Sequence, residues 1–188
     1  MARYFACYSH DDEMIVKPLI DWWRLVSPVF FDQDCIEPGE EWEERLHSAI
    51  RGAEKIFVFW CTHAQKSRWV KREYVLAIKL DRTVVPILMD GTKLPRPLRA
   101  YQYRDARGIS RHDERYQAVR APANIAFVQS VKSASVKLTT PDSLRERLGC
   151  EQVTADQLVA AWNTDLGARA PAAEEEQDFL RGAATIIL

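Results

Sequence analysis

One carboxylate stands among apolar residues on a segment whose pattern predicts a helix. Glu73 lies in "KSRWVKREYVLAIKL", residues 66–80, an amphipathic pattern. Its helical neighbours three and four positions away are all apolar: Trp69, Val70, Leu76 and Ala77. No basic side chain therefore stands where a helix would pair a surface carboxylate. Glu73 is either a helix carboxylate that snorkels to solvent or a group that acts on a ligand.

Cys61 and His63 are the second pair of residues whose types could do chemistry. A thiol beside an imidazole suggests a cysteine nucleophile, but we expect the two side chains to leave a strand in different directions, and no third group that would orient them is evident. The cysteines show no C-x-x-C pair and no histidine at metal-ligand spacing. They are Cys7, Cys35, Cys61 and Cys150. We therefore expect buried free thiols and no metal site.

Length and composition restrict the class of protein. A chain of 188 residues has the size of one domain with room for a small appendage. Its net charge of −1 gives no overall attraction to nucleic acid or to an anionic membrane. The N-terminus reaches acidic residues before any signal-type apolar region, and no apolar run is long enough to span a bilayer. We expect a cytoplasmic protein with neither nucleic acid nor membrane as a partner.

Strands and helices alternate along the first part of the chain. Apolar runs predict strands at 3–9, 28–32, 55–61, 83–90 and 101–105. Helices are predicted at 12–26, where Pro18 either kinks the helix or marks its first turn, at 40–52, where Gly52 ends it, and at 66–80. This order predicts a doubly wound parallel sheet, which binds ligands at the carboxyl ends of its strands. The loops after the first three strands should converge on a cleft with Trp69 and Glu73 on its wall.

The segments themselves resemble a known family. "FACYSHDD", "FFDQDCIEPGEEWEERLHSAIRGAEKIFVFW", "SRWVKREYVLAI" and "VVPILMD" with "LP" close behind look like successive signature segments of a TIR (Toll/interleukin-1 receptor) domain of the bacterial, NAD-cleaving type. The resemblance covers about residues 3–105. It implies an α/β, flavodoxin-like, five-stranded parallel sheet, with the family's long loop at 32–41. We expect a TIR domain at 1–120 and a small C-terminal extension of unknown role at 121–188.

The resemblance also implies an activity. Many TIR domains cleave NAD⁺ at the nicotinamide N-glycosidic bond with a glutamate in a W-x-x-x-E helix, and here those positions are Trp69 and Glu73. NAD⁺ would be the substrate, and no cofactor is implied. A single carboxylate is enough, because nicotinamide leaves as a neutral amine and needs no general acid, unlike the alkoxide of an ordinary glycoside. Glu73 would stabilise the oxocarbenium-like charge on the ribose.

Four further residues are candidates for binding the substrate, and three of them match substrate-binding positions of such domains. Ser9 and His10 match positions that face phosphates and ribose, although Ser9, two residues before Asp11, is equally typical of a helix N-cap. Trp42 matches an aromatic that stacks on a base, but it also begins the apolar stripe of its helix. Asp32 orients the loop, touches ribose or is only a turn residue that ends its strand.

Two alternatives attach to the same region. Trp69 could be only a core anchor. Cys61 stands where many relatives have a serine, and a thiol is a poorer hydrogen-bond partner, although Thr62 could compensate.

Beyond residue 105 the resemblance fades. Residues 108–124 predict a connection and a helix, and the alternation of 133–140 predicts an exposed strand. A threonine cap and a glycine stop predict a helix at 154–167. Residues 168–178 have the composition of a linker. The apolar end, 179–188, either docks back on the domain, meets a partner subunit or begins a further segment.

Two functions of different classes remain. The first is an NAD⁺ glycohydrolase or cyclase, an immune or antiphage effector that becomes active when head-to-tail assembly lets a neighbour's loop 32–41 complete the cleft. The second is a non-catalytic scaffold that recruits other TIR proteins. The W-x-x-x-E pair favours the enzyme, since adaptor TIR domains generally lack it. A receiver of phosphate or nucleotide with the same fold is weaker, because the other strand ends show no aspartate and lysine set.

Overall fold

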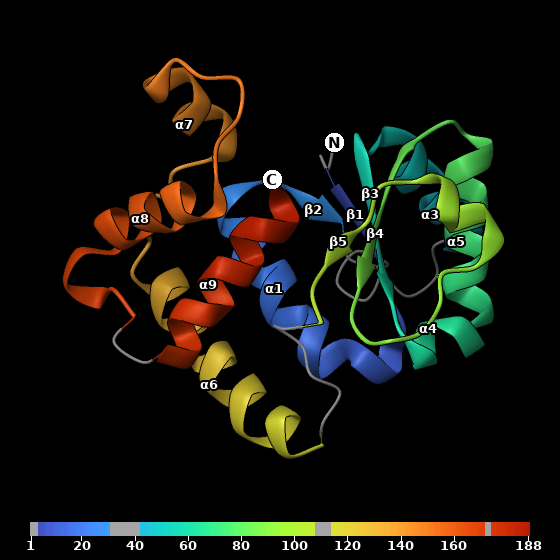
Figure 1. Ribbon diagram of the computed structural model, residues 1–188, viewed down its shortest axis with the longest axis horizontal. Coiled ribbons are helices and arrows are strands. Elements are labelled where there is room, and N and C mark those ends of the chain that lie inside the picture. Colours follow the sequence, from blue (N-terminus) through green and yellow to red (C-terminus); the bar gives the residue numbers. More distant parts are fainter. Residues whose placement is uncertain (1–3, 31–41, 108–113, 172–173) are drawn as a thin grey trace.

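A parallel β-sheet lies at the centre of the molecule, for which the computed structural model describes residues 4–30, 42–107, 114–171 and 174–188 (Figure 1). Its strand order is β2-β1-β3-β4-β5, and every neighbouring pair is parallel. The strands are β1 (Tyr4–Cys7), β2 (Val29–Phe30), β3 (Lys55–Trp60), β4 (Thr83–Leu88) and β5 (Arg104–Asp105). The predicted α/β class with a parallel, doubly wound sheet is confirmed, and the two edge strands are only two residues long.

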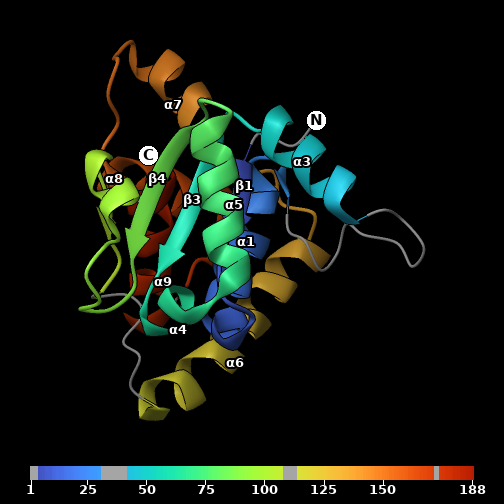
Figure 2. The ribbon, with the colours of Figure 1, turned by 90° about the vertical axis from the view of Figure 1, so that its right-hand side faces the viewer.

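Helices cover both faces of this sheet. On one face lie α3 (Trp42–Gly52) and α5 (Arg68–Lys79), and on the other lie α1 (Glu13–Val26) and α9 (Glu174–Ile187) (Figures 1 and 2). The short α4 (Thr62–Lys66) connects β3 to α5, and a 3-10 turn, η2 (Arg96–Ala100), follows β4. A strand covered on two faces has no solvent side, which explains why β3 is apolar almost throughout.

The order of strands reverses between β1 and β3. The chain leaves β1 to form β2 on one side, and then returns to form β3 on the other. Figure 2 shows the arrowheads of β3 and β4 pointing toward the end of the sheet where α4 lies. In open parallel sheets, the crevice outside the strands at such a reversal is where ligands bind.

Helix α1 is buried on two sides. A 3-10 turn, η1 (His10–Asp12), precedes it, and Pro18 lies inside the helix, so Pro18 does not mark its first turn. Trp23 faces the sheet, with its ring centroid 5.0 Å from that of Phe57. Trp22 faces away from the sheet and contacts three aromatic rings of later helices: Phe127, Trp162 and Phe179.

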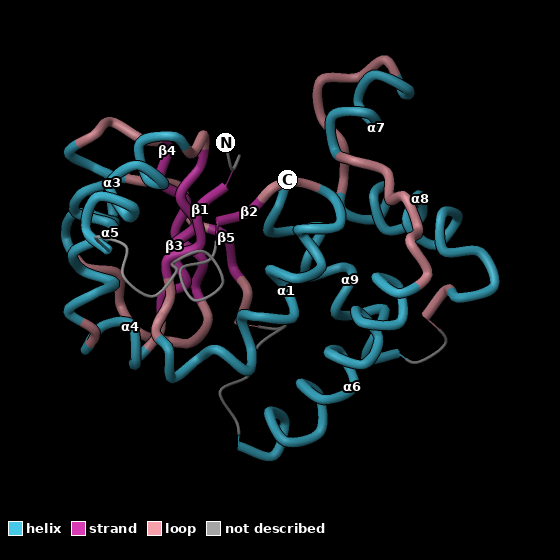
Figure 3. Tube along the Cα trace, turned by 180° about the vertical axis from the view of Figure 1, so that it is seen from behind, coloured by secondary structure: helices cyan, strands magenta, loops and turns pink. Residues whose placement is uncertain are grey.

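Those later helices are α6 (Glu114–Ser133), α8 (Ala155–Leu166) and α9, which pack around α1 (Figure 3). Helix α7 (Pro141–Leu148) projects away from α1, and a 3-10 turn, η3 (Gly167–Arg169), precedes α9. The helix predicted at 154–167 is confirmed, because Thr154 forms a capping box with Gln157 and Gly167 is the C-cap. Of the helices in the described ranges, none is both long and apolar enough to cross a membrane.

The strand predicted at 133–140 is wrong. Helix α6 continues to Ser133, and residues 136–140 have no regular structure. The backbone of Thr139 forms hydrogen bonds with side chains of α8 and not with a neighbouring strand. Its N–H donates to the Asp165 carboxylate at 2.6 Å, and its carbonyl accepts from the Trp162 indole N–H at 2.8 Å. The alternation therefore comes from a loop that docks Leu138 into the core.

The linker predicted at 168–178 is wrong from Glu174 onward, where α9 begins. Glutamates form helices well and are favourable in the first turn of a helix. The glutamates that suggested a linker therefore lie at the start of a helix. The apolar end docks back on the domain: Leu180 and Ala183 are fully buried, and the Trp23 indole N–H donates to the Ala183 carbonyl at 3.3 Å. Of the three interpretations of this end, docking is the one that the structure supports.

Candidate functional site

A cleft of about 760 Å³ opens where β1 and β3 end. Two segments supply its walls: the residues that follow β1, and the run from α4 into the first half of α5. The lining residues are Tyr8, Ser9, His10, Asp11, His63, Lys66, Ser67, Arg68, Trp69 and Glu73. Two of the three predicted loops therefore meet at one site. The third, which contains Asp32, lies outside the described residues.

Glu73 lies in the α5 wall of this cleft and is only 5% exposed. Its position depends on how α5 starts, because the Ser67 hydroxyl caps the helix by accepting from the Val70 N–H at 3.3 Å. A side chain with so little exposure does not reach bulk solvent. The snorkelling interpretation is therefore wrong, and Glu73 is a buried carboxylate at a cleft.

Trp69 lies one helical turn before Glu73 and is 52% exposed. The interpretation of this ring as a core anchor is therefore wrong. The Arg72 guanidinium carbon lies 5.7 Å from the centroid of the indole, within the range of a cation–π contact. The ring presents an aromatic surface at the cleft on which a planar group could stack.

Ser9 and His10 follow β1 and line the opposite side of the cleft from α5. The backbone carbonyl of Ser9 accepts from the Asp12 N–H at 2.8 Å, which forms the η1 turn, but the Ser9 side chain makes no capping hydrogen bond. The N-cap interpretation of the Ser9 hydroxyl is therefore wrong. The His10 ring lies 5.9 Å from the Tyr8 ring at a tilt of 42°.

Two cations at the cleft were missed by the sequence analysis. Lys66 at the end of α4 and Arg68 at the start of α5 both line it, and both are exposed. Their signal in the sequence was their place between the third predicted strand and the W-x-x-x-E pair of Trp69 and Glu73. Exposed lysine and arginine side chains are the usual partners of phosphate groups, the arginine by a bidentate fork.

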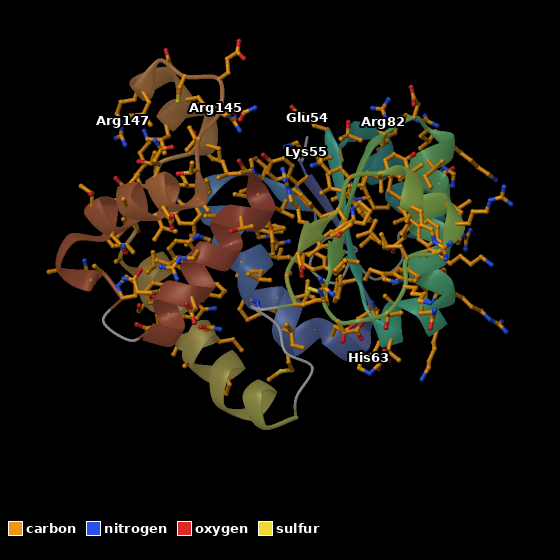
Figure 4. All side chains as sticks on the ribbon, in the orientation of Figure 1. Glu54, Lys55, His63, Arg82, Arg145 and Arg147 are labelled. Atoms are coloured by element: carbon orange, nitrogen blue, oxygen red, sulfur yellow. The ribbon has the colours of Figure 1, made fainter. Side chains whose placement is uncertain are left out.

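A cluster next to the cleft joins the buried Asp12 and Cys61 to the partly exposed His63. The Cys61 thiol donates to one oxygen of the Asp12 carboxylate at 2.8 Å, and His63 Nδ1 lies 2.7 Å from the other. Asp12 is thus the third orienting group whose absence the sequence analysis assumed, and that assumption is wrong. Figure 4 labels His63, which lies in α4, near the end of the sheet where β3 ends.

The thiol of this cluster is nevertheless a poor nucleophile. Burial, with the hydrogen bond to Asp12, raises the pKa of Cys61 to about 12. The thiol therefore stays protonated at neutral pH, and the thiolate is the nucleophilic form. Thr62 does not compensate at the cleft, because its hydroxyl contacts Asp90 and Thr92, each at 2.9 Å.

Trp42 is the remaining predicted site residue. It is the first residue of α3, but its side chain lies outside the described part of the chain. The roles of Trp42 and Asp32 at the cleft therefore stay predictions.

Fold and site together define a parallel α/β protein with a cleft at the switch point of its sheet. A family model described as TIR domain matches residues 5–120, and the chain belongs to this family. The family includes NAD-cleaving enzymes, and its members generally self-associate or bind other TIR proteins.

Among solved structures, the chain is similar to the TIR domain of the Toll-related receptor TRR-2 from the lower metazoan Hydra magnipapillata. The identity is 18% and the TM-score 0.49, with 69% of this chain and 99% of that chain covered. No curated protein matches the chain.

Proposed function

We propose that this TIR domain is an NAD⁺ glycohydrolase or cyclase and that Glu73 is its catalytic carboxylate. The observation that carries the proposal is the place of Glu73: a carboxylate 5% exposed, in the wall of the cleft at the switch point, with the exposed Trp69 one turn away. Desolvated carboxylates in a cleft are typical of sites that act on a bound ligand.

The rest of the cleft suits a dinucleotide. Lys66 and Arg68 supply two positive charges for the pyrophosphate, and Trp69 offers a ring on which a base can stack. Ser9 and His10 add polar groups on the facing wall, within reach of phosphate or ribose hydroxyls. The volume of about 760 Å³ lies within the usual range for small-molecule sites.

The chemistry assigns one task to Glu73. The bond between the ribose C1′ and the nicotinamide nitrogen breaks, and its electron pair leaves with nicotinamide, which becomes a neutral pyridine. The positive charge moves to the ribose, where the Glu73 carboxylate stabilises it more strongly than in the ground state. Water then adds to C1′ and gives up a proton to solvent, which yields ADP-ribose. Attack by a nitrogen of the adenine instead would give a cyclic product.

The same proposal extends to the partners of the protein. TIR domains generally associate with one another, and we infer that a neighbouring copy's loop 32–41 completes the cleft. An enzyme that is active only when assembled suits an immune or antiphage effector, because NAD⁺ would then be consumed only after a trigger.

Nicotinamide release from NAD⁺ tests the proposal. We expect the purified chain, crowded or assembled, to release nicotinamide, and Glu73→Ala to release none above the blank. Equal rates of nicotinamide release from both proteins would show that Glu73 is not the catalytic residue. No turnover by the wild type under any condition of assembly would support the scaffold function in place of the enzyme. The identity of the second product separates NAD⁺ depletion from production of a signal.

A further inference from the structure

We propose that Asp12, Cys61 and His63 form a binding site for one Zn²⁺ ion beside the cleft. The three residues offer a carboxylate oxygen, a thiol sulfur and an imidazole nitrogen, and their donor atoms all lie within 4.8 Å of one another. These are the three donor types that zinc takes in proteins. The proposal does not depend on NAD⁺ cleavage.

The three ligands come from separate places in the fold. Asp12 ends η1 and occupies the N-cap position of α1, yet its side chain makes no capping hydrogen bond and turns to the cluster instead. Cys61 follows β3, and His63 lies in α4. Because β1 and β3 are adjacent parallel strands, the residues that follow them meet at one edge of the sheet.

The environment suits an ion with an open coordination position. Asp12 is 2% exposed and Cys61 is fully buried, whereas the His63 side chain is 41% exposed and lines the cleft. An ion would therefore enter past the imidazole and be held by the two buried groups. Three protein ligands leave a fourth position for water or a ligand, and here that position would lie on the cleft side.

Binding requires a rearrangement of the three side chains. Tetrahedral zinc bonds place pairs of donor atoms about 3.4 to 3.6 Å apart. The thiol and the imidazole contact different oxygens of Asp12, at 2.8 Å and 2.7 Å, so each must move away from the oxygen it contacts by less than about 1 Å. One donor atom from each residue already lies within 4.8 Å of the other two, so the widest separation must close by at most about 1.4 Å. The ion replaces the thiol proton, which passes to solvent, and the sulfur binds as thiolate.

Cobalt substitution tests the site directly, because Co²⁺ reports both tetrahedral geometry and a thiolate ligand in its absorption spectrum. We expect the full chain, stripped with a chelator and kept reduced, to take up one Co²⁺ with intense visible bands and a sulfur-to-cobalt charge-transfer band, and Zn²⁺ to displace both. Cys61→Ser should abolish the charge-transfer band, and His63→Gln should weaken affinity at least about tenfold.

Two control variants make the same changes of residue type elsewhere in the chain. Cys150→Ser and His47→Gln should leave the spectrum and the affinity unchanged. Zn²⁺ should also raise the Tm of the wild type but not of His63→Gln, which changes a side chain that is 41% exposed and leaves the core unaltered. A charge-transfer band that survives Cys61→Ser, or that disappears in Cys150→Ser, would overturn the assignment, as would saturating Co²⁺ without tetrahedral bands.

Discussion

Trp69 and Glu73 stand one turn apart on α5, yet one is half exposed and the other is buried. This difference suits two roles at one cleft. The exposed ring offers a surface on which a planar group can stack, and the buried carboxylate can stabilise a positive charge on a bound ligand. The exposed tryptophan contributes little to the core, so the two roles can be separated experimentally.

Trp69→Ala should weaken the use of NAD⁺ without loss of stability. Loss of a stacking contact costs about 1 to 3 kcal/mol, which corresponds to a fall of roughly 5-fold to 150-fold in kcat/KM. The free energy of unfolding should change by no more than about 0.5 kcal/mol, as for other exposed positions. Steady-state kinetics and urea unfolding measure the two effects. Trp69→Phe keeps a ring and should retain most of the activity; a Trp69→Ala enzyme with unchanged kcat/KM would remove the ring from the site.

Cys61 gives the stability of the fold a dependence on alkaline pH. Burial, followed by the hydrogen bond to Asp12, raises its pKa from 9.0 to about 12. Between these values the folded chain keeps a proton that the unfolded chain loses, so the free energy of unfolding falls as the pH rises.

Cys61→Ser lacks this contribution. We therefore expect the free energy of unfolding of the wild type to fall by about 1 kcal/mol more than that of Cys61→Ser between about pH 8 and about pH 10. Urea unfolding of both proteins across this range measures the shift. Parallel pH dependence would show that the Cys61 thiol titrates alike in the folded and unfolded chain.

At the scale of elements, α9 belongs to the core. Leu180 is fully buried, whereas its neighbour Arg181 has an exposed side chain with ion pairs at 3.3 and 3.6 Å. Leu180→Ala should lower the free energy of unfolding by about 2 to 5 kcal/mol, and Arg181→Ala by at most about 1 kcal/mol. Chemical denaturation compares the two. Equal small losses would mean that α9 is not held on α1 in solution.

Elements with a local signal were predictable from the sequence. The apolar run of β3 and the capping box and glycine stop of α8 depend on neighbouring residues alone. The place of the cleft was also predictable, because it follows from the order of strands.

Features that depend on distant residues were not predictable. The residues of the loop at 136–140 alternate as in a strand, but the backbone of Thr139 forms its hydrogen bonds with side chains of α8. Those side chains lie 23 and 26 positions away in the sequence. The Asp12 cluster joins residues 49 and 51 positions apart. From the sequence, Cys61 and His63 could be considered only as a pair. Asp12 comes close to them only when β1 and β3 pair in the sheet.

At the scale of the whole molecule, α1 packs against two layers. Trp23 faces the sheet, and Trp22 faces the C-terminal helices, with its ring centroid 5.4 Å from that of Trp162. Helix α6 also runs through the boundary predicted between residues 120 and 121. The residues after 120 therefore cover a surface that the TIR segment would otherwise expose.

A fragment of residues 1–120 should fold poorly for this reason. Without α8 and α9 it exposes Trp22 and cuts α6 short, so we expect weak dispersion in its NMR spectrum and aggregation at concentrations where the full chain is monodisperse. Thermal unfolding of fragment and full chain gives the second comparison. A fragment with a Tm near that of the full chain would establish 1–120 as an independent domain.

Nicotinamide release by a matched pair of carboxylate variants tests the central claim most directly. Glu73→Gln removes the charge at the cleft with little change of shape, and Glu146→Gln does the same on the exposed surface of α7. With NAD⁺ binding measured in parallel, Glu73→Gln should bind NAD⁺ yet release nicotinamide at least about 10²-fold more slowly, while Glu146→Gln should match the wild type. Release by Glu73→Gln at the wild-type rate would contradict the account.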